Sequence, residues 1–99
     1  MNKVHTPKSL LDYVKNVQLI EVKKNELRVV EGQIKVIEND SDLFETVSDL
    51  YSKSVCQVIE TYLQENLNTL MKEKFQLQLE INDLERKVID FEFKAYFED

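Results

Sequence analysis

Residues 63–97 read LQENLNTLMKEKFQLQLEINDLERKVIDFEFKAYF. The fold assignment depends on this stretch, because it carries two apolar periodicities that predict different structures. One periodicity alternates steps of four and three, as along a coiled-coil seam. Its members are Leu63, Leu67, Leu70, Lys74, Leu77, Ile81, Leu84, Val88, Phe91 and Ala95. The other alternates apolar and polar residues with period two, which is typical of half-buried strands. Its apolar members are Phe75, Leu77, Leu79, Ile81, Ile89, Phe91, Phe93, Ala95 and Phe97.

The residues that each periodicity leaves over favour strands. A helix leaves five large apolar side chains off its seam, namely Phe75, Leu79, Ile89, Phe93 and Phe97. Each such side chain left in water forgoes about 1.5–3 kcal/mol. We therefore expect a β-hairpin at 75–97, with strands 75–81 and 89–97, although no glycine marks a tight turn. Its open edges would invite a partner strand. The alternative is an all-α coiled coil.

The chain before this stretch is expected to be helical. Thr6-Pro7 reads as an N-cap followed by a first helical residue, and a coiled-coil helix is predicted over 7–38. Its apolar seam follows steps of three and four, with Lys24 filling one position, and a three-residue step between Leu27 and Val30 interrupts the heptad alternation. The seam comprises Leu10, Tyr13, Val17, Ile20, Leu27, Val30, Ile34 and Ile37. Further apolar residues widen this seam and indicate a second contact surface: Leu11, Val14, Leu19, Val22, Val29 and Val36.

A helix break is predicted at Asn39-Asp40-Ser41-Asp42, because these side chains compete for backbone hydrogen bonds and favour caps. Asp42 and Glu45 fit a capping box, so a core helix is expected over 42–72. A continuous bent helix is the alternative. The expected fold is thus a single domain over 1–99, mainly α with a C-terminal β-hairpin (α+β).

No catalytic, cofactor-binding or metal-binding constellation is found in the sequence. One Gly excludes a phosphate-binding loop, and one histidine (His5) with one cysteine (Cys56) makes no zinc site. The net charge of −6, about +3 up to Lys35 and −9 after it, argues against direct nucleic-acid binding. No apolar run approaches a membrane span, and a lone cysteine suits a reducing compartment, so a cytoplasmic protein is expected. The missing catalytic constellation predicts that it is not an enzyme.

The stretch from residues 43–48 through 67–70, followed by 75–81, resembles the coiled-coil-to-head junction of SbcC and chromosome-maintenance ATPases, particularly short bacteriophage versions. Residues 89–93 match the next strand of that pattern, and the resemblance covers roughly residues 10–99. The resemblance implies a coiled-coil arm leading into head strands, and a link to DNA recombination or repair in a phage or bacterium. The Walker A, signature and Walker B motifs of that family are missing, so no functional residue is carried over.

We therefore expect a protein–protein interaction module that forms a homodimer or higher oligomer, or docks on another protein. The residues expected to mediate association are Leu10, Val17, Ile20, Leu27, Ile34, Phe91, Phe93 and Phe97. The alternative is a small acidic phage-encoded inhibitor whose carboxylates compete with nucleic acid for a host protein's basic groove. Neither hypothesis involves a small-molecule substrate.

Overall fold

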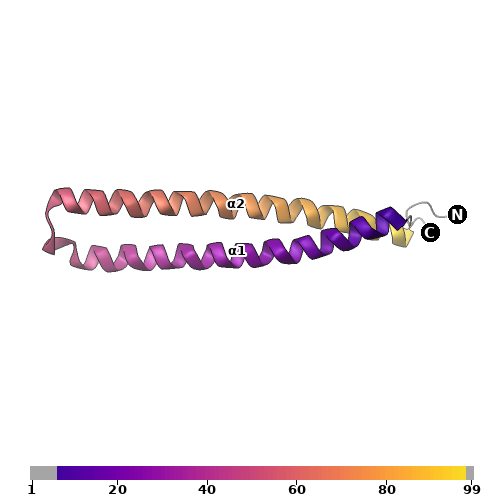
Figure 1. The fold of residues 1–99 in the computed structure, drawn as a ribbon, viewed down its shortest axis with the longest axis horizontal. Helices are drawn as coiled ribbons and strands as arrows, with labels where there is room; N and C mark the ends of the chain where they lie inside the picture. Colours follow the sequence, from indigo (N-terminus) through magenta and orange to yellow (C-terminus); the bar gives the residue numbers. More distant parts are fainter. Residues whose placement is uncertain (1–6, 98–99) are drawn as a thin grey trace. The chain divides into compact units, whose positions relative to one another are not determined.

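The computed structural model describes residues 7–97, without the side chains of residues 95–97, and every described residue except Tyr51 and Ser52 is helical. Helix α1 runs over Pro7–Val47, a short 3-10 helix over Ser48–Leu50, and α2 over Lys53–Phe97 (Figure 1). The described part of the chain contains no strand. The all-α alternative is therefore correct, and the predicted β-hairpin at 75–97 is wrong.

The heptad periodicity prevails over the period-two pattern in α2. Ile81 and Leu84 are buried, and Leu77, Val88 and Phe91 are half-buried. A helix satisfies its backbone hydrogen bonds internally, whereas a two-stranded hairpin leaves two open edges. The residues between the apolar positions are mostly Gln, Glu, Lys and Arg, which favour helix, and no Gly or Pro interrupts them.

The side chains that favoured strands in the sequence are left largely in water by this helix. Phe75 is 62% exposed, Leu79 48%, Ile89 64% and Phe93 58%. A helix was expected to leave these side chains in water, and within a single chain it does. This exposure bears on what the chain associates with.

The predicted helix break at residues 39–42 is also absent, because α1 continues to Val47. The apolar seam continues past this polar cluster to Phe44 and Val47, both half-buried, and packing there outweighs the local preference for a cap. The hydroxyl of Thr46 donates a hydrogen bond to the Asp42 carbonyl oxygen at 3.0 Å, inside the helix. The helix is therefore continuous across residues 39–42, as in the alternative, but it ends at Val47.

The chain reverses at Ser48–Ser52 instead. Tyr51 is extended (φ −121°, ψ 157°), and its N–H donates to the Ser48 carbonyl oxygen at 3.2 Å. Ser52 then caps α2: its Oγ accepts from the Val55 N–H at 3.3 Å, and its carbonyl oxygen accepts from the Cys56 N–H at 3.0 Å. The second helix thus begins at Lys53 and not at Asp42, because a serine N-cap is available there.

The described chain forms two compact units, which we treat separately. The terminal unit comprises residues 7–26 of α1 and 77–97 of α2. Tyr13 stacks on Phe91 and Lys23 pairs with Glu80, so the two segments run antiparallel. The buried apolar residues of this unit are Ile20, Ile81 and Leu84.

The turn unit comprises residues 27–76, which form an antiparallel helical hairpin around the reversal at 48–52. Val30 and Ile34 are its buried apolar residues. Leu27 is half-buried, so the three-residue step from Leu27 to Val30 keeps both side chains on the seam. The facing positions of α2 are half-buried and comprise Ile59, Leu63, Leu67 and Leu70. This burial pattern is compatible with a coiled coil.

Candidate interaction surface

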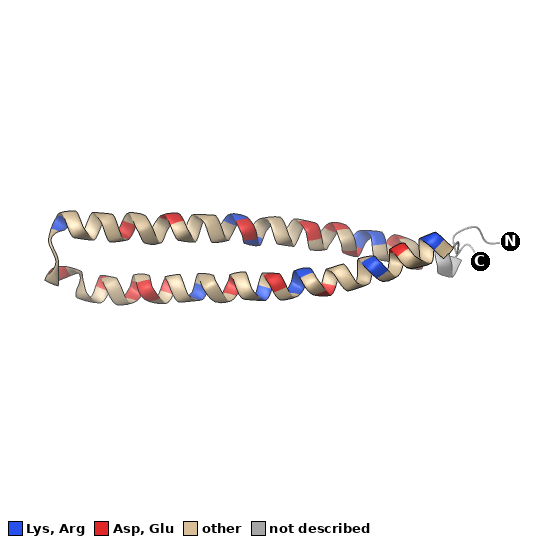
Figure 2. Cartoon of the chain, viewed as in Figure 1, with Lys and Arg blue, Asp and Glu red and all other residues tan. Residues whose placement is uncertain are grey.

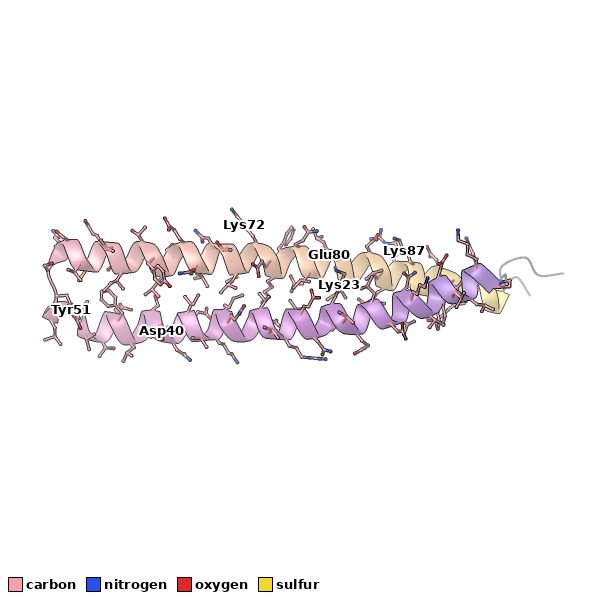
Figure 3. The ribbon with its side chains drawn as sticks, viewed as in Figure 1. Lys23, Asp40, Tyr51, Lys72, Glu80 and Lys87 are labelled. Carbon is pink, nitrogen blue, oxygen red and sulfur yellow. The ribbon has the colours of Figure 1, made fainter. Side chains whose placement is uncertain are left out.

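Two lysine–glutamate pairs join the helices of the terminal unit. Lys23 Nζ bonds Glu80 Oε2, and Lys24 Nζ lies 3.6 Å from Glu85 Oε2. In Figure 3, Lys23 and Glu80 point toward one another from α1 and α2. Charged pairs beside a narrow apolar seam restrict helices to one register and direction. These pairs therefore help to select the antiparallel alignment seen in this unit.

The pKa of Lys23 is raised above its ordinary value of 10.5. The main cause is the hydrogen bond that its ammonium donates to Glu80, and the negative charges of Glu80 and Glu26 act in the same direction. Desolvation lowers the pKa but does not outweigh them. Lys23 therefore stays charged at neutral pH, and the ion pair with Glu80 is maintained there.

The turn unit has one corresponding pair between its helices, in which Lys74 Nζ lies 3.5 Å from Glu31 Oε2. Lys74 occupies a heptad seam position on α2, where its aliphatic stem can cover apolar surface while the ammonium reaches a carboxylate. Both side chains are partly exposed, at 33% and 46%. The pair therefore serves alignment more than stability.

An open groove of about 780 Å³ lies between α1 and α2 in the turn unit. Most of its lining residues are polar or charged, and Ser41 occupies a seam position where a large apolar residue would fill the space. The lining residues are Lys35, Ile37, Glu38, Asn39, Ser41, Asp42, Glu60, Leu63, Gln64 and Leu67. Sites for small molecules are mostly apolar and enclosed, so this groove does not resemble one.

The association residues predicted on α1 occupy different environments. Ile20 and Ile34 are buried and Leu27 is half-buried within the chain's own helix pairs. Leu10 is 42% exposed and Val17 39%. The first three side chains thus have packing partners inside one chain, and only the last two retain substantial surface for another molecule.

The association residues predicted near the C-terminus also separate. Phe91 is half-buried and stacks on Tyr13, with ring centroids 4.7 Å apart and an interplanar angle of 26°. Phe93, two residues later, is 58% exposed, because residues i and i+2 lie on different faces of a helix. Phe97 lies in α2, and its side chain is outside the described part of the structure.

An exposed, uncharged stripe runs along α1 in the turn unit. We call it the α1 outer stripe; its residues follow steps of three and four and are Val29, Gly32, Val36, Asn39, Leu43 and Thr46. Val29 is 61% exposed, Val36 57% and Leu43 66%. The excess of apolar residues in the sequence signalled a second surface, but the predicted helix break at 39–42 hid the continuity of this stripe.

Gly32 lies in the middle of this stripe, and a Cβ built there meets nothing within 4 Å. A glycine inside a helix costs about 1 kcal/mol relative to alanine. No packing within the described chain requires a residue without a side chain at this position. Gly32 therefore marks a place on α1 that is both locally unfavourable and open to a close neighbour.

Helix α2 also exposes large apolar side chains in each unit. In the turn unit they are Val55, Val58, Tyr62, Met71 and Phe75, and in the terminal unit Leu79, Ile89 and Phe93. Several were identified in the sequence, but as one face of two strands. The helical structure distributes them outside the buried seam.

Both helices carry charges of both signs (Figure 2), although residues 36–52 contain five acidic residues and no Lys or Arg. Each of α1 and α2 carries six Lys or Arg against eight Asp or Glu. The acidic balance that follows Lys35 in the sequence therefore does not make one helix acidic and the other basic. The mixed pattern is typical of solvated helix faces.

Other candidate chemistry is sparse in the part of the chain that the structure describes. The Cys56 thiol is half-buried and donates to the Ser48 carbonyl oxygen at 3.4 Å, which fits a structural role at the reversal. No group of three His, Cys, Asp or Glu side chains among residues 7–97 could hold a metal ion. None of the described helices has the length and hydrophobicity needed to cross a membrane.

Comparisons of the chain with protein-family models, with curated proteins and with solved structures find no match.

Proposed function

We propose that this chain is a non-catalytic association module that binds other copies of itself through the outer faces of its helices. The observation that carries the proposal is the distribution of apolar residues. Among the described residues, five apolar side chains are buried, whereas nineteen large ones are exposed. Exposed apolar side chains that share one face mark interaction sites, and Val29, Val36 and Leu43 share one face of α1.

The inner seam supports a scaffold role. Ile20, Ile34 and Ile81 hold the two helices of each unit together, and the lysine–glutamate pairs fix their register. The outer faces are then presented on helices that are already paired. Because their backbone is already ordered, association costs less conformational entropy than it would for an unfolded segment.

A narrower form of the proposal is an accessory role beside DNA recombination or repair ATPases in a phage or bacterium, which rests on the sequence resemblance alone. An acidic inhibitor that mimics nucleic acid requires a coherent acidic surface. Each helix carries six basic and eight acidic residues (Figure 2), although residues 38–49 contain five acidic residues and no basic one. The exposed apolar side chains, more than the charge distribution, favour the association module.

The proposal is tested by thermal unfolding at different protein concentrations, followed by far-ultraviolet circular dichroism. Association of folded chains stabilises them by mass action, so the midpoint of unfolding should rise with concentration. We expect a rise of several degrees between low micromolar and near-millimolar protein. A midpoint that stays constant over this range would contradict self-association.

A further inference from the structure

We propose that two copies of this chain pack antiparallel through the α1 outer stripe, each stripe against the same stripe of the other copy. This inference rests on the proposed function and specifies its partner and register. The stripe runs from Val29 to Thr46 on one face of α1, wholly inside the turn unit.

The absence of charge on the stripe fits a second copy. None of the stripe's residues is ionisable, in a chain of which 32% of residues are charged. Two such stripes meet without burying a charge, whereas a charged partner face would have to desolvate unpaired charges on this surface. Because a two-fold interface places the same patch on both sides, a neutral patch is compatible with itself.

The antiparallel alignment that matches the stripe to itself pairs residues whose numbers sum to 75. Gly32 then faces Leu43 of the second copy, Val36 faces Asn39, and Val29 faces Thr46. Each layer combines one apolar side chain with a glycine or a polar side chain, and polar residues at such positions specify the register at a cost in stability.

This alignment accounts for the glycine at position 32. Its missing side chain leaves open space on α1, and Leu43 of the second copy is a large apolar side chain, 66% exposed in the single chain. A side chain packed over a glycine lets two helices approach closely. The alignment therefore accounts for a residue that packing within the described chain leaves unexplained.

The residues that flank the stripe are complementary in the same alignment. Flanking residues pair with an offset of two residues from the layers of the stripe, in opposite senses on the two flanks. Lys35 thereby comes opposite Asp42 of the second copy, and the two-fold axis repeats this pair. On the other flank, Gln33 faces Asp40, so an amide meets a carboxylate. All four side chains are exposed in the single chain. Such flanking pairs set partner choice and direction in helix pairs.

The size of the contact predicts its strength. The stripe is about 26 Å long, from a rise of about 1.5 Å per residue. As a strip about 10 Å wide on each copy, it covers roughly 500 Å² in total, well below the about 1,200 Å² of stable complexes. This contact alone therefore gives weak, rapidly reversible association, which small changes in charge should alter measurably.

A charge-swap experiment tests the inference, with association constants from sedimentation velocity on the full chain. Lys35→Glu and Asp42→Lys each turn both symmetric attractions into repulsions, and each should weaken association by roughly tenfold. The double variant restores opposite charges and should recover association to within about threefold of the unchanged chain. Lys72→Glu is the control, since Lys72 is an exposed lysine on α2. Circular dichroism at low concentration verifies that each variant folds.

The outcomes separate the inference from the proposed function. If the unchanged chain does not associate at all, the proposed function fails. If it associates and Lys35→Glu behaves like Lys72→Glu, the association uses another surface and this inference fails alone. Weakening in both single variants without recovery in the double variant contradicts the proposed register. Weakening with recovery supports it.

Discussion

Individual seam positions show what a heptad pattern specifies and what it does not. Ile20, Leu27 and Ile34 were identified from the sequence as association residues, and the structure places all three on packed faces. The neighbours are the chain's own second helix, because periodicity specifies which face is buried but not which chain buries it. Gly32 could not be interpreted without the structure, since only the open space around it reveals its position on the outer face.

The ion pair of Lys23 with Glu80 should make stability depend on alkaline pH. The pKa of Lys23 is raised in the folded state, mainly by its hydrogen bond to Glu80. Its contribution is therefore complete below the ordinary value of 10.5 and is lost as pH rises through the raised pKa. Lys23→Gln should lower the unfolding temperature at neutral pH, and this difference should shrink as the pH rises above 10.5 and through the raised pKa.

The measurement is the unfolding temperature of both proteins at several values from neutral to strongly alkaline pH. Lys72→Gln provides the control, because Lys72 is exposed on α2 (Figure 3) and should leave the unfolding temperature nearly unchanged throughout. A difference between Lys23→Gln and the unchanged chain that persists at the highest pH would show that the lost aliphatic packing, and not the ion pair, is responsible.

Local sequence signals predict some features of the helices correctly and others wrongly. Pro7 is helical, as the sequence predicts, and the predicted N-cap Thr6 lies outside the described residues. The chain reverses at Ser48–Ser52 and not at residues 39–42. Both segments are rich in Ser and Asp, and only the burial of Phe44 and Val47 distinguishes them. In α2, residues 75–81 are helical despite their period-two pattern, because packing on the facing helix buries one residue in three or four.

The helical assignment of residues 75–97 has a direct mutational test. In a strand, Leu79 and Ile81 would lie on the same face and respond alike to truncation. In α2 they lie on different faces, with Ile81 6% and Leu79 48% exposed. Ile81→Ala should therefore destabilise the chain by about 2–4 kcal/mol, and Leu79→Ala by less than about 1 kcal/mol.

Urea unfolding at low protein concentration measures both free energies without a contribution from association. Each variant is the control for the other, since the two substitutions remove side chains of similar size from the same helix. Equal losses from the two variants would favour a strand over the helix described here.

In the described part of the molecule, few apolar side chains are buried and many are exposed to water. Packing of α1 and α2 within each unit uses one face of each helix and leaves the others in water. The expectation that this chain exposes more apolar surface than it covers followed from the sequence, although through a β-hairpin that does not form. The outer stripe of α1 became recognisable only once that helix proved continuous.

The most direct test of self-association is the mass of the purified chain by sedimentation equilibrium over a wide concentration range. The account predicts an apparent mass near 11.7 kDa at high dilution that rises toward twice this value as concentration increases. An apparent mass that stays at 11.7 kDa up to near-millimolar concentration would contradict it.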